Sequence, residues 1–265
     1  MLLLIKAQNA LLFNVHPKMT TLSTPNPEVS WLSDSILSVV VVGASGDLAK
    51  KMTFPSLLNL FADNLFPKNV RIWGFARSKI SSAELRDKLR PFMEKKGNHS
   101  AAVIESFLSC VHYQPAASYG DQDAFASLDV SMKEFEKEHP ESTFQHRLFY
   151  FAIPPNVFAA TALAIKQKAM QDKSKGWTRL IVEKPFGRDL ETFEVLNKTL
   201  SEHFTEDHLY RIDHYLGKEL VQNLTVLRFS NIWLEKLWNA DNIKCVILTF
   251  KENFGTDGRG GYFDK

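Results

Sequence analysis

The strongest constraint on the fold is a continuous apolar run that leads directly into two closely spaced glycines. Residues 36–42 read Ile-Leu-Ser-Val-Val-Val-Val, and Gly43 and Gly46 follow. Such a β-branched run is typical of a parallel strand that is buried on both faces. Glycines between a strand and a helix let the backbone approach a phosphate, which the positive end of the helix dipole also attracts. The segment therefore predicts a dinucleotide-binding turn. An ordinary strand-to-helix turn is the alternative, because G-x-x-G is shorter than the usual G-x-G-x-x-G.

Strands and helices alternate regularly through the rest of the first 212 residues. Apolar runs predict strands, and apolar residues at spacings of three and four predict helices with one buried face. Pro55 is expected in the first turn of a helix, Asn156 is expected to cap a later helix, and a further helix is expected to open at Asp189. The alternation predicts an α/β fold, a doubly wound (Rossmann-type) parallel sheet with helices on both faces. We expect strands at residues 36–42, 70–76, 148–153, 180–182 and 209–212, and helices at residues 54–65, 81–95 and 124–138, after Asn156 and after Asp189.

The regular alternation ends at about Asp213. A helical stretch at residues 218–229 precedes one strong strand at residues 243–250, and a glycine-rich segment covers residues 255–261. One strand does not form a sheet, so this region is interpreted as the start of an incomplete α+β domain. The predicted organisation is a tail at residues 1–34, a nucleotide-binding domain at residues 35–212 and the truncated second domain at residues 213–265.

Composition excludes several classes of protein. The chain has 32 basic and 30 acidic residues, a balance that predicts no binding of nucleic acid. No apolar run reaches 18 residues, so we expect no membrane span. Cys110 and Cys245 form neither a metal-binding nor a redox spacing. We expect the tail to be disordered, and a targeting segment is the alternative.

The residue after the second predicted strand distinguishes between two nicotinamide cofactors. A protein that binds NAD usually has Asp or Glu at this corner, where the carboxylate accepts a hydrogen bond from the ribose 2′-hydroxyl. Here the strand ends at Arg77, whose guanidinium suits the 2′-phosphate of NADP. The sequence therefore favours NADP, and the alternative is an arginine that is merely solvated.

Two further motifs lie where predicted strands end, which is the edge at which open α/β sheets bind ligands. Lys184 precedes Pro185, so a stiff backbone holds its side chain near that edge. The second motif, residues 213–218, reads Asp-His-Tyr-Leu-Gly-Lys. His or Lys can neutralise a phosphate, and a carboxylate can orient an imidazole. These motifs predict a site for a phosphorylated, hydroxyl-rich ligand.

Four segments together resemble the glucose-6-phosphate dehydrogenase family. They read GASGDLAKK from Gly43, EKPFGRD from Glu183, RIDHYLGKE from Arg211 and TFKENFGTDGRGGYFD from Thr249. Their order and spacing are similar over residues 35–264, and RIDHYLGKE is the most specific of them. The resemblance implies an oxidoreductase of carbohydrate metabolism. Its reaction would oxidise C1 of glucose 6-phosphate to 6-phosphogluconolactone with hydride transfer to NADP, the first step of the oxidative pentose phosphate pathway.

The resemblance also implies roles for individual residues. Arg77 would bind the 2′-phosphate, and Asp213 would orient a base histidine that is expected beyond Lys265. The family often has a cofactor-contacting tyrosine where this chain has Phe158. Lys184 would contact both cofactor and substrate. The implied pyrophosphate cradle consists of Gly43, Ala44, Ser45, Gly46, Asp47, Leu48, Ala49 and Lys50. The other implied substrate-binding residues are His214, Tyr215, Lys218 and Glu252.

Activity and assembly follow from the same resemblance. Because the base histidine is expected beyond Lys265, we expect the 265-residue polypeptide to be inactive or nearly so. The alternatives are a noncatalytic NADP-binding form, a regulatory partner of a complete subunit, or another sugar-phosphate oxidoreductase. RIDHYLGKE argues against the last of these. The full-length family implies a homodimer or homotetramer. No cysteine precedes Cys110, which favours the cytosol (cytoplasmic) over the plastid.

Overall fold

The computed structural model describes residues 34–96, 99–187, 189–213, 215, 217–249, 251 and 255. The chain divides into two compact units, and the boundary between them lies between Asp213 and His214. Apart from Asp34, the predicted tail lies outside the described residues. Its predicted disorder therefore stays a prediction.

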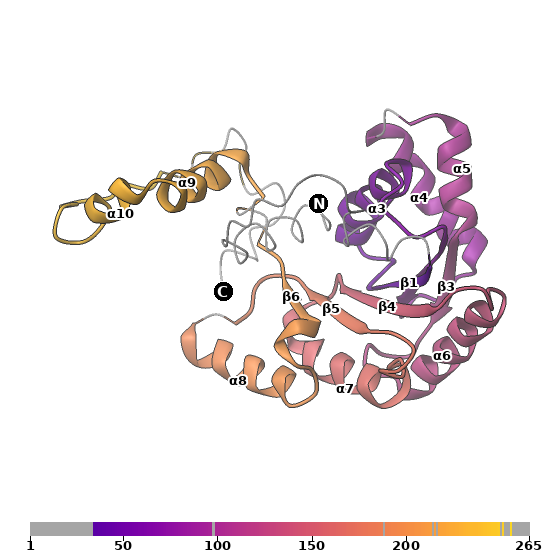
Figure 1. Cartoon of the computed structure of the whole chain (residues 1–265). Helices are drawn as coiled ribbons and strands as arrows, with labels where there is room; N and C mark the ends of the chain where they lie inside the picture. The colour runs from indigo at the N-terminus through magenta and orange to yellow at the C-terminus, as the bar shows by residue number, and fades with distance from the viewer. Residues whose placement is uncertain are drawn as a thin grey trace. The chain divides into compact units, whose positions relative to one another are not determined.

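The first unit is built on one sheet of six parallel strands in the order β3-β2-β1-β4-β5-β6 (Figure 1). The order reverses at β1, so the carboxyl ends of β1 and β4 border the place where open α/β sheets bind ligands. The predicted doubly wound α/β fold is confirmed. The strands are β1 (Ser35–Val42), β2 (Asn69–Ala76), β3 (Val111–Pro115), β4 (Phe144–Phe151), β5 (Thr178–Val182) and β6 (Leu209–Arg211).

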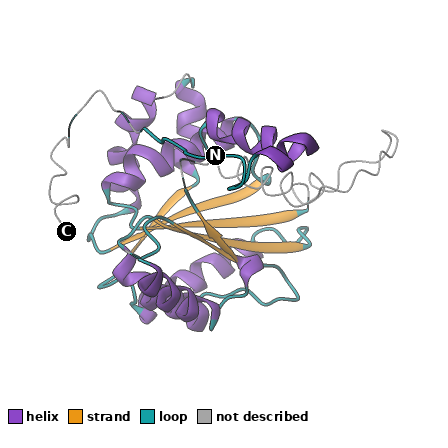
Figure 2. Ribbon diagram, turned by 90° about the vertical axis from the view of Figure 1, so that its left-hand side faces the viewer, coloured by secondary structure: helices purple, strands orange, loops and turns teal. Residues whose placement is uncertain are grey.

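Helices cover both faces of the sheet, which Figure 2 shows as a layer between two helical layers. Odd-numbered residues of β1 such as Val39 pack with α3, α4 and α5, and even-numbered residues such as Val40 pack with α6, α7 and α8. All eight residues of β1 are buried, as its apolar run predicts. The helical segments are η1 (Ala49–Thr53), α3 (Phe54–Ala62), α4 (Ser82–Lys96), α5 (Ala101–Ser109), α6 (Gln122–Lys137), η2 (Pro155–Val157), α7 (Phe158–Lys168), α8 (Leu190–Ser201) and η3 (Glu206–His208).

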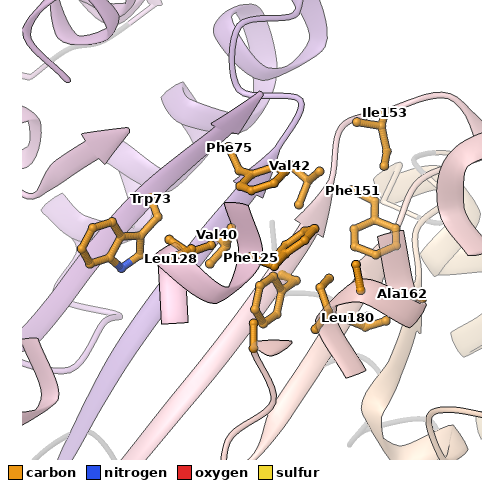
Figure 3. Packing of buried hydrophobic residues seen from close by; sticks show 14 of the residues in the cluster. Val40, Val42, Trp73, Phe75, Phe125, Leu128, Phe151, Ile153, Ala162 and Leu180 are labelled. Atoms are coloured by element: carbon orange, nitrogen blue, oxygen red, sulfur yellow. The ribbon is translucent and has the colours of Figure 1, made fainter. Parts of the chain in front are cut away.

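The core between the sheet and α6 and α7 is rich in aromatic rings. Phe75 stacks on Phe125 with ring centroids 4.2 Å apart, and Phe151 lies 5.7 Å from Phe158. Figure 3 shows Phe75, Phe125 and Phe151 gathered between the strands and a helix. Complete burial of one such side chain contributes about 1.5–3 kcal/mol to stability. This packing joins α6 and α7 to the sheet.

The helix predicted to open at Asp189 is confirmed, and the cap predicted at Asn156 is wrong. The Asp189 carboxylate accepts a hydrogen bond of 2.9 Å from the Thr192 N–H and caps α8. Asn156 does not cap α7, because the short turn η2 begins at Pro155 and contains Asn156. Helix α7 starts only at Phe158, and no side chain caps it.

Two elements of the first unit, α5 and β3, were not predicted from the sequence. Strand β3 lies at the edge of the sheet, and only its first residue, Val111, is buried. A short edge strand carries too few apolar residues to give a clear pattern. Helix α5 has nine residues, and the Ser100 side chain caps it by accepting a hydrogen bond from Val103 N–H.

The described residues of the second unit form two helices, α9 (Glu219–Ser230) and α10 (Ile232–Leu237). The helix predicted at residues 218–229 is confirmed. The strand predicted at residues 243–250 is wrong for residues 243–249, which are exposed and irregular, and Phe250 lies outside the described residues. A strand needs a neighbour to pair its N–H and C=O groups, and no described residue of this unit forms one. The strand on which the α+β prediction for this unit rested is therefore absent from its described part.

No described helix combines the length and the apolar character needed to cross a membrane.

Candidate functional site

The turn after β1 lies against the segment that follows β4. Gly43 N–H donates a hydrogen bond of 2.7 Å to Phe75 O, and Gly46 N–H donates one of 2.9 Å to Gly43 O. Gly43 has a φ of +89°, and a Cβ there would lie 2.2 Å from Ala152 O. Only glycine fits at this residue, since both the left-handed backbone and the close contact exclude a side chain. The turn is therefore fixed against both neighbouring strands.

A helical segment begins inside the predicted pyrophosphate cradle. The hydrogen bond from Lys50 N–H to Gly46 O, 3.1 Å long, belongs to its first turn, and the segment continues through η1 into α3. First-turn N–H groups have no acceptor within the helix and carry the positive end of its dipole. Gly46, Asp47 and Leu48 are exposed, so an anion can reach this end.

Charged residues set the electrostatics at this helix end, and apolar residues attach the turn to the core. The ammonium groups of Lys51 and Lys50 lie 2.9 and 3.4 Å from the Asp47 carboxylate. These ammonium groups, Lys51 first, hold the pKa of Asp47 below its ordinary value. Two cations and one anion leave the helix end with a net positive charge. Ala44 and Ala49 are fully buried and anchor the turn on the core.

The end of β2 lies beside this turn. The Ser78 hydroxyl donates a hydrogen bond of 2.9 Å to the Ser45 hydroxyl. The neighbouring Arg77 is exposed, and its guanidinium carbon lies 5.1 Å from the centroid of the Tyr119 ring. The structure thus brings the predicted pyrophosphate cradle and the segment of the predicted 2′-phosphate arginine into direct contact.

Sequence reasoning missed three residues at this corner: Ser78, Tyr113 and Tyr119. The Tyr113 hydroxyl donates to Ala76 O at 3.1 Å and to Ser78 O at 2.7 Å. These two carbonyls flank Arg77, so the hydroxyl holds the backbone on both sides of it. Burial, with a smaller contribution from Tyr119, raises the pKa of Tyr113 to about 12. Recognising β3 as the neighbour of β2 would have pointed to Tyr113 and to the following loop, which carries Tyr119.

Lys184 lies just beyond the carboxyl end of β5 and is exposed. The preceding residue, Glu183, accepts a short hydrogen bond from the Tyr150 hydroxyl on β4. Burial, followed by the neighbouring Glu183 carboxylate, raises the pKa of Tyr150 well above its usual range, so the hydroxyl stays a donor. Because all strands are parallel, Lys184 lies at the same edge of the sheet as the turn after β1.

The second unit contributes only part of the predicted substrate site to the described structure. Lys218 Nζ lies 4.3 Å from the centroid of the Tyr215 ring, and Lys218 N–H donates to Tyr215 O at 3.1 Å. His214 and Glu252 lie outside the described residues. Asp213 is the last residue of the first unit. The structure therefore brings Tyr215 and Lys218 together, and the roles of the whole group stay predictions.

The first unit fits a dinucleotide phosphate. Gly43 leaves no room for a side chain, the helix end is open to an anion, and residues 76–80 contain no carboxylate that would repel a 2′-phosphate. Phe158, the residue at which the resemblance implies a cofactor-contacting tyrosine, is fully buried in the core. Among the described residues, no cluster of His, Cys, Asp or Glu could hold a metal ion.

Comparisons with protein families give two matches. The family model described as "Glucose-6-phosphate dehydrogenase, NAD binding domain" matches residues 40–223, and "Glucose-6-phosphate dehydrogenase, C-terminal domain" matches residues 225–265. Glucose-6-phosphate 1-dehydrogenase 6, cytoplasmic, of Arabidopsis thaliana is 48% identical over 234 residues, which are 86% of this chain and 45% of the relative. A chloroplastic glucose-6-phosphate 1-dehydrogenase of Solanum tuberosum is 45% identical, over 87% of this chain and 39% of the relative.

Solved structures match over a similar part of the chain. A glucose-6-phosphate dehydrogenase in complex with its substrate glucose-6-phosphate has a TM-score of 0.77 and 43% identity, covering 88% of this chain and 48% of the other. A glucose-6-phosphate 1-dehydrogenase from Mycobacterium avium has a TM-score of 0.69 and 32% identity, covering 87% and 47%. The chain thus spans about half the length of the relatives that it matches.

Proposed function

Since the chain belongs to the glucose-6-phosphate dehydrogenase family, we propose that it binds NADP as the cofactor-binding part of an enzyme that oxidises glucose 6-phosphate. The observation that carries this proposal is the hydrogen bond between Ser78 and Ser45, because it joins the glycine turn to the Arg77 corner. NADP has a pyrophosphate for the first segment and a 2′-phosphate for the second, whereas NAD would leave the Arg77 guanidinium without an anion.

The preference for NADP is supported by charge. The exposed Arg77 guanidinium and the carboxylate-free sequence of residues 76–80 favour an added phosphate. The lysines at the helix end favour the pyrophosphate. Charge-assisted hydrogen bonds of this kind contribute about 1.5–3 kcal/mol each, enough for a tenfold preference or more.

The reaction assigns a task to each remaining residue of the site. When bound, the nicotinamide would supply the hydride acceptor for the oxidation at C1 of the sugar. We assign Lys184, at the ligand-binding edge of the sheet, to contacts with both cofactor and substrate. Asp213 would hold, by a hydrogen bond, the imidazole that takes the C1 hydroxyl proton. The sugar-phosphate and sugar contacts are proposed at His214, Tyr215, Lys218 and Glu252.

The second candidate is an NADP-binding protein that does not catalyse by itself. Its support is that every described residue of the predicted cofactor site lies in the first unit, which has its own core. Such a protein would bind NADP with the same residues and would not oxidise glucose 6-phosphate.

Calorimetric titration of the purified 265-residue chain with NADP and with NAD tests the shared part of both candidates. We expect NADP to bind at least ten times more tightly, and equal affinities would contradict the proposal. Subsequent addition of glucose 6-phosphate to the NADP complex tests the expected inactivity of the 265-residue chain. Formation of NADPH would exclude the noncatalytic candidate, whereas its absence is expected for both candidates.

A homo-oligomer in the cytosol completes the proposal. The slightly higher identity to the cytoplasmic relative supports this location. Tagging the chain at its C-terminus and following it in cells tests the location, and light scattering tests for the homodimer or homotetramer.

A further inference from the structure

Two tyrosines from one neighbouring segment surround the end of β2. Tyr113 lies on β3, and Tyr119 lies in the loop between β3 and α6. Neither belongs to the glycine turn or to any of the sequence motifs. We propose that this pair positions Arg77 for the 2′-phosphate and thereby sets the preference for NADP over NAD. The inference rests on the proposed function and adds two positioning residues to it.

Tyr113 acts on the backbone of the corner. Its hydroxyl donates to the carbonyls of Ala76 and Ser78, the residues on either side of Arg77. Its own N–H donates to the Ser82 hydroxyl at 2.9 Å, which ties the strand to the start of α4. With a pKa raised to about 12 by burial, the Tyr113 hydroxyl keeps its proton at neutral pH and stays a donor. The direction in which the Arg77 side chain leaves the backbone is therefore fixed.

Tyr119 acts on the Arg77 side chain. The guanidinium carbon lies 5.1 Å from the centroid of the ring, within the range of a cation–π contact. An aromatic face attracts a cation but accepts no conventional hydrogen bond from it. The N–H groups of Arg77 therefore remain available to a phosphate while the side chain is already ordered. Ordering a long exposed side chain before binding lowers the entropy cost of the complex.

The loop that carries Tyr119 is itself held in place. The Asp121 carboxylate accepts hydrogen bonds from Ala117 N–H at 2.8 Å and Ala124 N–H at 3.0 Å. A Cβ at Gly120 would lie 3.3 Å from Cβ of Ala160, so the loop packs closely on α7. The Tyr119 ring also packs against the aromatic core. It is therefore a fixed surface for the guanidinium.

The test measures dissociation constants for NADP, NAD and adenosine 2′,5′-bisphosphate in the full chain. Tyr119→Leu removes the aromatic face, Tyr119→Phe keeps it, and Tyr113→Phe removes only the hydroxyl. We expect Tyr119→Leu to weaken binding of NADP and of the bisphosphate roughly fivefold, with NAD unchanged and Tyr119→Phe like the wild type. Tyr113→Phe should change the affinities in the same direction as Tyr119→Leu. Thermal unfolding checks that each variant folds. If Tyr119→Leu does not fold, the affinities of Tyr113→Phe alone test the inference.

The possible outcomes distinguish failure of this inference from failure of the proposed function. If the wild-type chain prefers NADP and the variants keep the same ratio of NADP to NAD affinity, the inference is wrong and the proposed function stands. An equal loss of affinity for both cofactors also overturns the inference, because it shows a purely structural role. If the wild-type chain binds neither cofactor, both the inference and the proposed function fall.

Discussion

The Ser78 hydroxyl lies 2.9 Å from the Ser45 hydroxyl and donates a hydrogen bond to it. This contact joins the segment after β2 to the turn after β1, although 32 residues separate the two serines in the sequence. It brings together the two segments to which the proposed function assigns the pyrophosphate and the 2′-phosphate.

Arg77→Glu is expected to reverse the cofactor preference. A carboxylate at this corner repels a 2′-phosphate and accepts a hydrogen bond from a 2′-hydroxyl, so NADP should bind at least tenfold more weakly and NAD no worse. Titration of both cofactors measures the change. Lys68→Gln is the matched control, because Lys68 is an exposed cation just before the first residue of β2. It should leave both affinities unchanged. If Arg77→Glu and Lys68→Gln had the same affinities for NADP and NAD, Arg77 would not contact the cofactor.

Gly43→Ala is expected to destabilise the first unit severely. The new methyl group would lie 2.2 Å from Ala152 O on a backbone with a φ of +89°, so the free energy of unfolding in urea should fall by about 3 kcal/mol or more. At Gly46 the nearest atom to an added Cβ is Gly43 O, at 3.1 Å. Gly46→Ala should therefore cost less than about 1 kcal/mol. A loss for Gly43→Ala as small as that expected for Gly46→Ala would show that the turn tolerates a side chain at residue 43.

Arg147→Met tests a buried ion-pair network at the start of β4. The guanidinium is completely buried, 2.5 Å from the Asp129 carboxylate and 2.9 Å from that of Glu136. Its removal leaves the two buried carboxylates without the guanidinium. Of the two, only Asp129 has another ion-pair partner among the described residues, Lys133. Stability should fall by about 3–5 kcal/mol.

The control for that variant is Arg90→Met, since Arg90 pairs with Glu105 at the surface. A surface pair of this kind contributes at most about 1 kcal/mol. Urea denaturation of both variants gives the comparison. A loss below 1 kcal/mol for Arg147→Met would contradict the structural role of the network.

His112 gives the first unit a dependence on pH. Burial, followed by the nearby Arg71 and Arg86 cations, lowers the pKa of His112 from 6.5 to about 4. Between these values the unfolded chain binds a proton that the folded chain does not, so stability falls as the pH drops through this window. His112 is only half buried, so solvent screening reduces the effect to about 1 kcal/mol.

Urea midpoints of the wild type and of His112→Gln at pH 7 and pH 4.5 measure this effect. The wild type should lose more stability than the variant over this interval, because every other titrating group is common to both. An equal loss in the two proteins would mean that His112 is protonated in the folded chain as readily as in the unfolded one.

Local sequence predicted the parts of this fold that depend on local physics. The apolar run of β1, the proline in the first turn of α3 and the Asp189 cap each act within a few residues, and the structure contains all three. Asn156 failed as a cap because a proline turn intervenes. The run at residues 243–249 has strand-like residues but no described neighbour to pair with, which local pattern cannot reveal.

The site shows the same division between local and long-range information. The glycine turn and Arg77 are visible in the sequence because each follows a strand. Ser78, Tyr113 and Tyr119 are not, since their contacts join neighbouring strands that are far apart in the chain. Strand β3 carries Tyr113 and leads into the loop that carries Tyr119, and its five residues have too weak a pattern to predict.

A crystal structure of the chain grown with NADP tests the proposed cofactor site most directly. We expect the pyrophosphate against the N–H groups that follow Gly46 and the 2′-phosphate within hydrogen-bonding distance of the Arg77 guanidinium. NADP bound elsewhere, or bound with its 2′-phosphate away from Arg77, would contradict it.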